Sequence, residues 1–132
     1  MTHNKAMGGN WTMKLSVGLD KRGYDIIIKN GSLQRAGLLG NLNRKVLVVS
    51  DTGVPEQYGK ALLAQCGEGH RAIGEQGEGS KSGAQWQELQ SRMLALGFTR
   101  GDAVAAVGGG VVGDLSGFAA AAYMRGISFF QF

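Results

Sequence analysis

The sequence has little proline, cysteine or histidine: of its 132 residues, one is proline, one is cysteine and two are histidine. Cys66 therefore has no partner for an intramolecular disulfide, which fits a reducing compartment. No apolar stretch approaches the roughly 18 residues of a membrane span, and the first residues lack the apolar core of a signal peptide. These absences predict a cytoplasmic protein that does not enter a membrane.

Runs of like charge are also missing, although the formal net charge is +4. Basic residues never follow one another in runs longer than two, and no basic stripe is interleaved with aromatic residues, so nucleic-acid binding is not expected. His3 and His70 lie in unrelated contexts. A lone histidine is more often solvated or structural than a metal ligand, and the sequence therefore predicts no metal site.

Glycine, in contrast, is abundant. The chain has 23 glycines among its 132 residues, well above the average glycine usage of about 7%. They follow no fixed period, which argues for tight turns and close backbone approaches and against a collagen-like or repeat architecture. With 43% hydrophobic and 18% charged residues, the composition is that of one globular domain.

Hydrophobic patterns predict a β-hairpin followed by alternating strands and helices. Residues 1–10 are polar and are expected to be flexible, and residues 11–132 form one domain. The hairpin is predicted over 11–17 and 24–28. Buried strands are then expected at 45–50 and 102–107, further strands at 71–73 and 126–132, and helices at 32–40, 55–66, 83–97 and from 110 onward. This alternation is typical of an α/β fold with a mostly parallel sheet and helices on both faces.

The chain stops on the last predicted strand, without a cap or a polar tail. Two interpretations are open: a small protein whose final strand lies at the sheet centre, or a cut made at the end of a strand. In the second case we expect an exposed apolar face that includes Phe129, Phe130 and Phe132. Trp86 and Phe118 have helical spacings that predict core positions.

The segment "VAAVGGGVVGDLSG" contains a G-x-G-x-x-G pattern at Gly108, Gly110 and Gly113, between a strand and a helix. Glycines there let the main chain approach a pyrophosphate, and the helix N-terminus favours the negative charge. Asp51 follows another strand and is predicted at the same sheet edge. The alternative is a turn with a purely steric role. Asp114, predicted in the first helical turn, would repel a phosphate and is expected to cap the helix or to contact a hydroxyl or amide.

Two further features are ambiguous from residue types alone. In "GEGSKS", Glu78 and Lys81 could hold a ribose hydroxyl and a phosphate, or the loop is simply solvated. Arg125, in "YMRG", suits a surface salt bridge as well as an anion site. Cys66 is expected to be a packing residue.

Taken in order, "YDIIIKNG", "VLVVSDTGV", "GEGSKS" and "GDAVAAVGGGVVGDLSGFAAAAYMRGISFFQF" resemble the N-terminal domain of the 3-dehydroquinate synthase family. The resemblance runs from about Met13 to Phe132, and its most specific part is "GGGVVGDLSGFAAAAYMRGI". It implies a Rossmann-like domain that binds NAD.

The resemblance also implies roles for single residues. Asp51 corresponds to an acid that contacts the adenosine ribose, and Asp114 to an aspartate near the nicotinamide. Arg125 resembles an arginine that reaches the substrate phosphate, in family dimers at the neighbouring subunit's site. Gly53 departs from the family, where asparagine is frequent. The implied cofactor-binding set is Asp51, Glu78, Gly79, Ser80, Lys81, Gly108, Gly109, Gly110, Val111, Val112, Gly113 and Asp114.

Family members continue beyond this point with a helical domain that supplies ligands to a divalent metal, zinc or cobalt. The resemblance implies conversion of 3-deoxy-D-arabino-heptulosonate 7-phosphate to 3-dehydroquinate and phosphate in the shikimate pathway, by a homodimer. Because the metal-binding domain is missing, this chain alone is expected to be inactive. The alternatives are another sugar-phosphate cyclase, a dehydrogenase with a similar first domain, and a stand-alone nucleotide-binding module.

Overall fold

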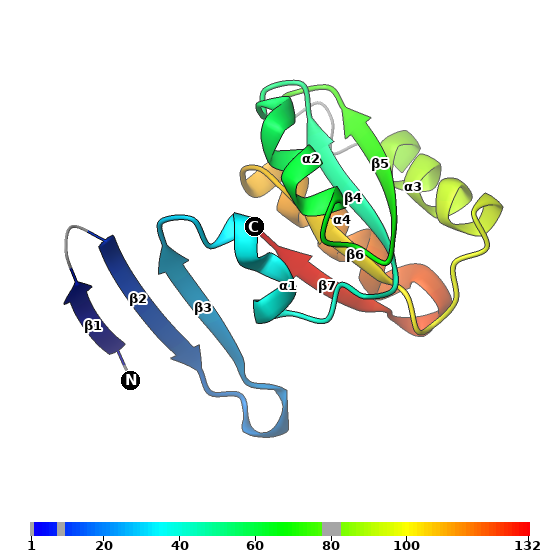
Figure 1. The fold of residues 1–132 in the computed structure, drawn as a ribbon. Coiled ribbons are helices and arrows are strands. Elements are labelled where there is room, and N and C mark those ends of the chain that lie inside the picture. The colour runs from blue at the N-terminus through cyan, green and yellow to red at the C-terminus, as the bar shows by residue number, and fades with distance from the viewer. Residues whose placement is uncertain (1, 8–9, 78–82) are drawn as a thin grey trace. The chain divides into compact units, whose positions relative to one another are not determined.

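The computed structural model describes residues 2–7, 10–77 and 83–132, and the chain divides into two compact units, Met1–Arg35 and Ala36–Phe132 (Figure 1). The first unit is a three-stranded antiparallel sheet in the order β1-β2-β3. Its elements are β1 (Thr2–Met7), β2 (Asn10–Val17), the 3-10 turn η1 (Asp20–Arg22), β3 (Tyr24–Lys29) and the 3-10 turn η2 (Leu33–Arg35).

The predicted hairpin is present as β2 and β3, but β1 was not expected. Residues 1–10, predicted to be flexible, include this strand and the first residue of β2, with Met7 paired to Asn10. The segment "THNKAM" has no apolar alternation, so hydrophobic periodicity did not indicate a strand there. The Gly8-Gly9 dipeptide in the sequence, typical of two-residue hairpin loops, is the signal that could have predicted it.

The second unit is an α/β layer structure whose four strands are all parallel, in the order β5-β4-β6-β7. This confirms the predicted fold class. The elements are α1 (Ala36–Leu39), β4 (Lys45–Asp51), α2 (Glu56–Leu63), β5 (Glu68–Gly74), α3 (Gly83–Ala95), β6 (Ala103–Ala106), α4 (Gly110–Ala122), the 3-10 turn η4 (Tyr123–Arg125) and β7 (Ser128–Gln131).

Helices cover both faces of this sheet, with α2 on one face and α4 on the other (Figure 1). Side chains alternate along each strand, so Leu47 and Val49 of β4 point to the same face as Val104 and Ala106 of β6. These four residues pack with buried residues of α3 and α4, namely Leu89, Met93, Val112, Ala119 and Ala120. Val46 and Val48, also buried, face the opposite side.

Four aromatic side chains differ in exposure from the predictions. Phe118 lies on the outside of α4 and is 61% exposed, although its ring contacts Trp86 at a centroid distance of 5.6 Å. Phe129, Phe130 and Phe132, predicted on an exposed apolar face, are each half-buried. Phe129 lies against Gly117, and Phe130 lies beneath the Arg44 guanidinium, 5.4 Å from the ring centroid.

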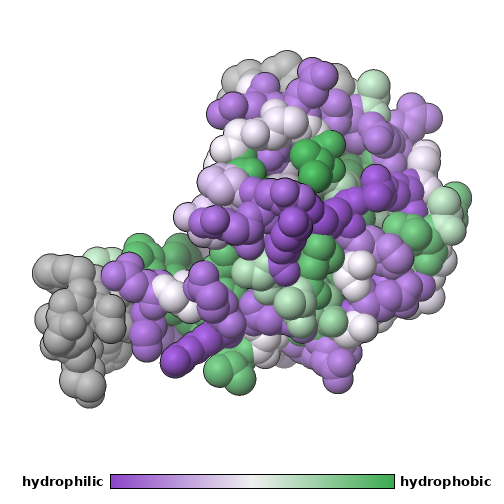
Figure 2. Space-filling view, turned by 45° about the horizontal axis from the view of Figure 1, so that its top comes forward, coloured by the Kyte–Doolittle hydropathy of each residue, from purple (hydrophilic) through white to green (hydrophobic). Residues whose placement is uncertain are grey.

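The surface that Figure 2 shows on the Ala36–Phe132 unit is mostly hydrophilic, with small separate hydrophobic patches. β7 lies at the edge of the four-stranded sheet, not at its centre. Among the described residues, no helix is long and apolar enough to cross a membrane.

Candidate nucleotide site

The chain topology creates one switch point at the carboxyl edge of the parallel sheet. From β4 the chain passes through α2 to β5 on one side, and β6, on the other side of β4, leads through α4 to β7. The loops that follow β4 and β6 therefore diverge to opposite faces of the sheet. Such a switch point is where open α/β sheets bind their ligands. Asp51 ends β4 and the glycine-rich turn follows β6, so the structure brings these two predicted features to the same edge.

Gly108 makes the tight turn that leads out of β6. Its φ is +148°, a value that residues with a Cβ rarely adopt. A Cβ at this position would also lie 3.0 Å from Val54 Cγ2 and 3.2 Å from Val112 Cγ2. The Gly108 N–H donates to the Phe132 carbonyl at 3.2 Å, which ties the turn to the end of β7.

Gly109 and Gly110 stand at the open start of α4. Gly109 is the N-cap and makes no side-chain capping hydrogen bond. A Cβ at Gly109 or Gly110 would have no atom within 4 Å, so the space over the first helical turn is clear. The first amide groups of a helix have no partner within it and carry partial positive charge. The turn therefore offers backbone donors and room for an anion such as a pyrophosphate.

Gly113 brings α4 close to β7. A Cβ there would overlap the Gln131 side-chain amide, with its Cδ at 2.9 Å. Gly108, Gly110 and Gly113 thus have separate roles, which are a tight turn, open access to backbone amides, and close packing of helix on strand. These are the roles that a dinucleotide-binding turn requires of its three glycines.

Asp51 folds back on its own turn. Its carboxylate oxygen Oδ1 accepts the Gly53 N–H at 2.8 Å, and its carbonyl oxygen accepts the Val54 N–H at 3.1 Å. The side chain is half-buried at the end of β4. The second carboxylate oxygen can accept hydrogen bonds from a ligand hydroxyl, since an ionised carboxylate has several acceptor positions.

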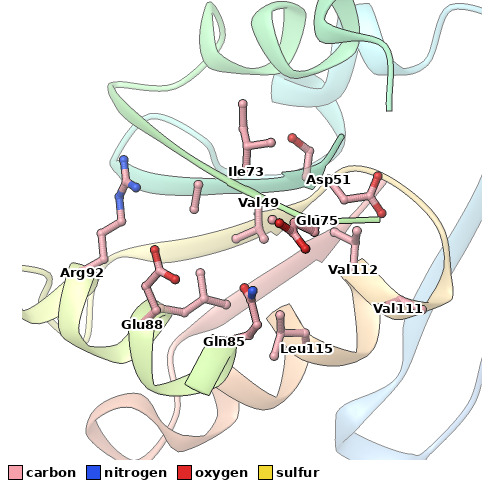
Figure 3. A pocket seen from close by; sticks show the side chains of 14 residues that line it. Val49, Asp51, Ile73, Glu75, Gln85, Glu88, Arg92, Val111, Val112 and Leu115 are labelled. Carbon is pink, nitrogen blue, oxygen red and sulfur yellow. The ribbon is translucent and has the colours of Figure 1, made fainter. Parts of the chain in front are cut away.

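A small pocket of about 40 Å³ opens beside Asp51 (Figure 3). Gln85, Glu88 and Arg92 of α3 border it on one side, and Val111 and Leu115 of α4 on another. Its complete lining is Val49, Ser50, Asp51, Ala72, Ile73, Gly74, Glu75, Gln85, Glu88, Leu89, Arg92, Val111, Val112 and Leu115. The polar residues of α3 were not predicted as site residues. Their pattern in the sequence is that of an ordinary solvated helix face.

The other predicted residues fall in different places. Glu78, Gly79, Ser80 and Lys81 lie outside the described residues. Val112 is buried in the core and Val111 is half-buried, so Val112 can serve a ligand only through its backbone. Asp114 was expected in the first turn of its helix. Because α4 begins at Gly110, Asp114 is instead the fifth helical residue, and it is exposed.

Arg125 lies far from the glycine turn within the chain. It follows the C-terminal end of α4, whereas the turn precedes the N-terminal end, and 13 residues of helix separate them by roughly 20 Å. Arg125 and its neighbour Met124 both have positive φ, at +66° and +47°. Positive φ in two consecutive residues other than glycine is unusual, and such strained backbone tends to cluster at functional sites.

Three charged side chains form ion pairs at α2, on the side of the sheet opposite α4. The Arg71 guanidinium, 3.3 Å from Glu56 Oε1, lowers the pKa of that carboxyl below its usual value, and Lys60 at 3.5 Å adds to this effect. Glu56 therefore stays ionised and paired. Among the described residues, no three side chains of histidine, cysteine, aspartate or glutamate gather in a metal-binding arrangement.

Residues 71–132 match the family described as 3-dehydroquinate synthase N-terminal. The 3-dehydroquinate synthase of Caulobacter vibrioides is 44% identical over 124 residues, which cover 87% of this chain and 33% of the relative. That of Streptococcus sanguinis is 41% identical over 126 residues, covering 90% of this chain and 36% of the relative. The chain belongs to the 3-dehydroquinate synthase family. It corresponds to the N-terminal part and spans about a third of the length of these curated relatives.

Solved structures of sugar-phosphate cyclases share the fold. A 2-deoxy-scyllo-inosose synthase complexed with carbaglucose-6-phosphate, NAD⁺ and Co²⁺ superposes with a TM-score of 0.79 at 26% identity, over 89% of this chain and 34% of that one. A 2-epi-5-epi-valiolone synthase from Streptomyces hygroscopicus with NAD⁺ and Zn²⁺ bound has a TM-score of 0.70 at 29% identity, over 87% of this chain and 33% of that one. Both of these structures contain NAD⁺ and a divalent metal ion.

Proposed function

We propose that this chain binds NAD at the turn between β6 and α4 and forms the cofactor-binding part of a 3-dehydroquinate synthase. The observation that carries the proposal is the geometry of Gly108, Gly110 and Gly113, with Asp51 at the same edge of the sheet. Backbone amides at the start of α4 would hold the pyrophosphate, and Asp51 would accept a hydrogen bond from a hydroxyl of the adenosine ribose.

The reaction proposed for the complete enzyme converts 3-deoxy-D-arabino-heptulosonate 7-phosphate to 3-dehydroquinate and phosphate, in the shikimate pathway. NAD, when bound, would accept a hydride from the carbon that bears one of the hydroxyls of the substrate ring. The part played by the described residues is to bind and orient the nucleotide. They do not assemble a metal site, so we assign no step of the metal chemistry to them and expect this chain alone to be inactive.

Arg125 is proposed to contact the substrate phosphate of a neighbouring subunit in a homodimer. About 20 Å of helix separate it from the glycine turn of its own chain, which favours a contact with the site of a neighbouring subunit. An exposed guanidinium on a strained segment suits bidentate binding of a phosphate. A cytoplasmic location is part of the proposal, because a single cysteine fits a reducing compartment.

A second candidate is another sugar-phosphate cyclase, favoured by the TM-score of 0.80 with a 2-deoxy-scyllo-inosose synthase. The identity is 26% with that structure and 44% with the Caulobacter synthase, so we prefer 3-dehydroquinate synthase. A stand-alone nucleotide-binding module would bind NAD in the same way but would support no reaction.

A chimera tests the proposal, with this chain in place of the N-terminal third of the Caulobacter synthase. We expect it to release phosphate from 3-deoxy-D-arabino-heptulosonate 7-phosphate, and we expect Gly110→Asp in the chimera to abolish this release. A folded chimera that binds NAD without releasing phosphate would favour the nucleotide-binding module.

A further inference from the structure

The loop that follows β5 lies against the loop that follows β4. The Thr52 N–H donates to the Gly74 carbonyl at 3.0 Å, and the Gln76 N–H donates to Thr52 Oγ1 at 3.2 Å. These two hydrogen bonds fix the Gln76 backbone beside the Asp51 turn. Gln76 was not singled out by any sequence motif.

The Gln76 side-chain amide rests on Gly53. A Cβ at Gly53 would lie 2.5 Å from Gln76 Nε2 and 2.6 Å from Oε1, distances that no real Cβ shows. The absence of a side chain at residue 53 is therefore what leaves room for the amide. The Gly53 N–H in turn donates to Asp51 Oδ1 at 2.8 Å, so that one turn connects the amide and the carboxylate. The Gln76 side chain is exposed at the carboxyl edge of the sheet.

The two groups are chemically complementary. An ionised carboxylate only accepts hydrogen bonds, whereas a side-chain amide has two donor hydrogens and an acceptor oxygen. A vicinal diol has two hydroxyls, each of which donates one hydrogen bond and accepts others. A carboxylate beside an amide can both accept hydrogen bonds from the hydroxyls of such a diol and donate one to them, whereas the carboxylate alone can only accept.

We propose that the Gln76 side-chain amide binds the adenosine ribose diol of the nucleotide together with Asp51, and that Gly53 keeps the space for it. This inference rests on the proposed NAD binding. In this proposal Gln76 binds the ligand only because Gly53 has no side chain. Gln76 is thus a residue that determines the affinity for an intact ribose.

Two variants remove the contact by different routes. Gln76→Ala deletes the amide. Gly53→Ala leaves it in the chain but forces it aside, because the new Cβ would overlap the end of a flexible side chain. The φ of Gly53 is not among the positive values, so alanine fits the backbone there. The matched control is Gln87→Ala, since Gln87 is an exposed glutamine of α3 that does not line the pocket.

Calorimetric titration with NAD and with an NAD analogue that lacks the adenosine 2′-hydroxyl distinguishes the outcomes. Loss of one hydrogen bond predicts an increase in Kd for NAD of about threefold to tenfold in Gln76→Ala and in Gly53→Ala. The double variant should bind no more weakly than Gln76→Ala, because both changes remove the same contact. For the deoxy analogue, the loss caused by Gln76→Ala should be smaller.

Unchanged NAD affinity in Gln76→Ala, with binding by the unaltered chain, would overturn the inference and leave the proposed function standing. Equal losses for NAD and the deoxy analogue would also overturn it, since the contact would then not involve the diol. Failure of the unaltered chain to bind NAD would contradict the proposed function itself, and the inference with it.

Discussion

Gly108, Gly110 and Gly113 meet three different physical demands. Gly108 has a backbone conformation that only glycine adopts easily, Gly110 faces open space, and Gly113 lies against Gln131. The spacing of these glycines predicted a phosphate-binding turn. From the structure we expect alanine to have a different effect at each position. It would strain the backbone at Gly108, block access to backbone amides at Gly110, and overlap a neighbouring side chain at Gly113.

Gly110→Ala should leave the fold intact and weaken the binding of NAD. Its Cβ meets no atom within 4 Å, so we expect the free energy of unfolding to change by less than about 0.5 kcal/mol. The same methyl group would hold a pyrophosphate away from the backbone amides. Charge-assisted hydrogen bonds are worth roughly 1.5–3 kcal/mol, so Kd should rise about tenfold or more. Denaturant unfolding and calorimetric titration measure the two effects separately.

Gly108→Ala should, unlike Gly110→Ala, destabilise the fold itself. The positive φ and the contacts with Val54 and Val112 predict a loss of at least about 1 kcal/mol of stability. If Gly108→Ala were as stable as the unaltered chain, the described turn geometry would be wrong.

The site residues differ in how far the sequence could predict them. Asp51 and the glycine turn follow buried strands, and parallel topology brings the ends of such strands to one edge. Gln76 could not be found in this way, because its position depends on a contact with Gly53 between two loops. No local pattern encodes a contact of that kind.

At the scale of elements, strand and helix types were predictable and several boundaries were not. The helix predicted over 55–66, just before Gly67, ends earlier in the structure, since α2 ends at Leu63. The role of Gly67 is instead a close approach to another segment, since a Cβ there would lie 2.8 Å from the Arg44 backbone nitrogen. Similarly, β1 lacks the apolar alternation from which strands are predicted.

Tyr123 joins the end of α4 to the loop after α3. Its buried hydroxyl donates to the Phe98 carbonyl at 2.8 Å, and the ring belongs to the core cluster. Burial, and secondarily the negative charge of Asp102, raises the pKa of the Tyr123 hydroxyl above its ordinary value. The neutral form is thus favoured in the folded chain.

This pKa shift predicts an alkaline loss of stability. Below about pH 10 the tyrosine is neutral in both states and its contribution is complete. As pH rises from there toward the folded pKa, the unfolded chain ionises first, and the free energy of unfolding falls. Tyr123→Phe should lose about 1 kcal/mol at neutral pH and show a smaller fall above pH 10. Urea unfolding at pH 7 and above pH 10 tests this, and equal pH slopes in the two proteins would contradict it.

At the scale of the whole molecule, the end of the chain is connected to the candidate site. The Phe132 N–H donates to the Ala106 carbonyl at 2.8 Å, and its own carbonyl accepts the Gly108 N–H at 3.2 Å. The order β5-β4-β6-β7 places these bonds beside the turn that is proposed to hold NAD. The end of β7 is therefore hydrogen-bonded directly to the glycine turn of the candidate site.

Removing Gln131 and Phe132 should consequently reduce both stability and NAD affinity. Two backbone hydrogen bonds are lost, which predicts a decrease of roughly 1–3 kcal/mol in the free energy of unfolding. Hydrogen exchange of the Gly108 amide should become faster than in the unaltered chain. An unchanged exchange rate at Gly108 would show that β7 does not support the turn.

The central claim is tested most directly by calorimetric titration of this chain with NAD, with the Gly110→Asp variant beside it. A carboxylate at residue 110 would occupy the open space over the first turn of α4 and repel the pyrophosphate. Its Cβ would have no neighbouring atom within 4 Å, so the fold should tolerate it. The account predicts saturable binding by the unaltered chain and none by an equally folded variant. Equal binding by both proteins, or no binding by the folded unaltered chain, would contradict it.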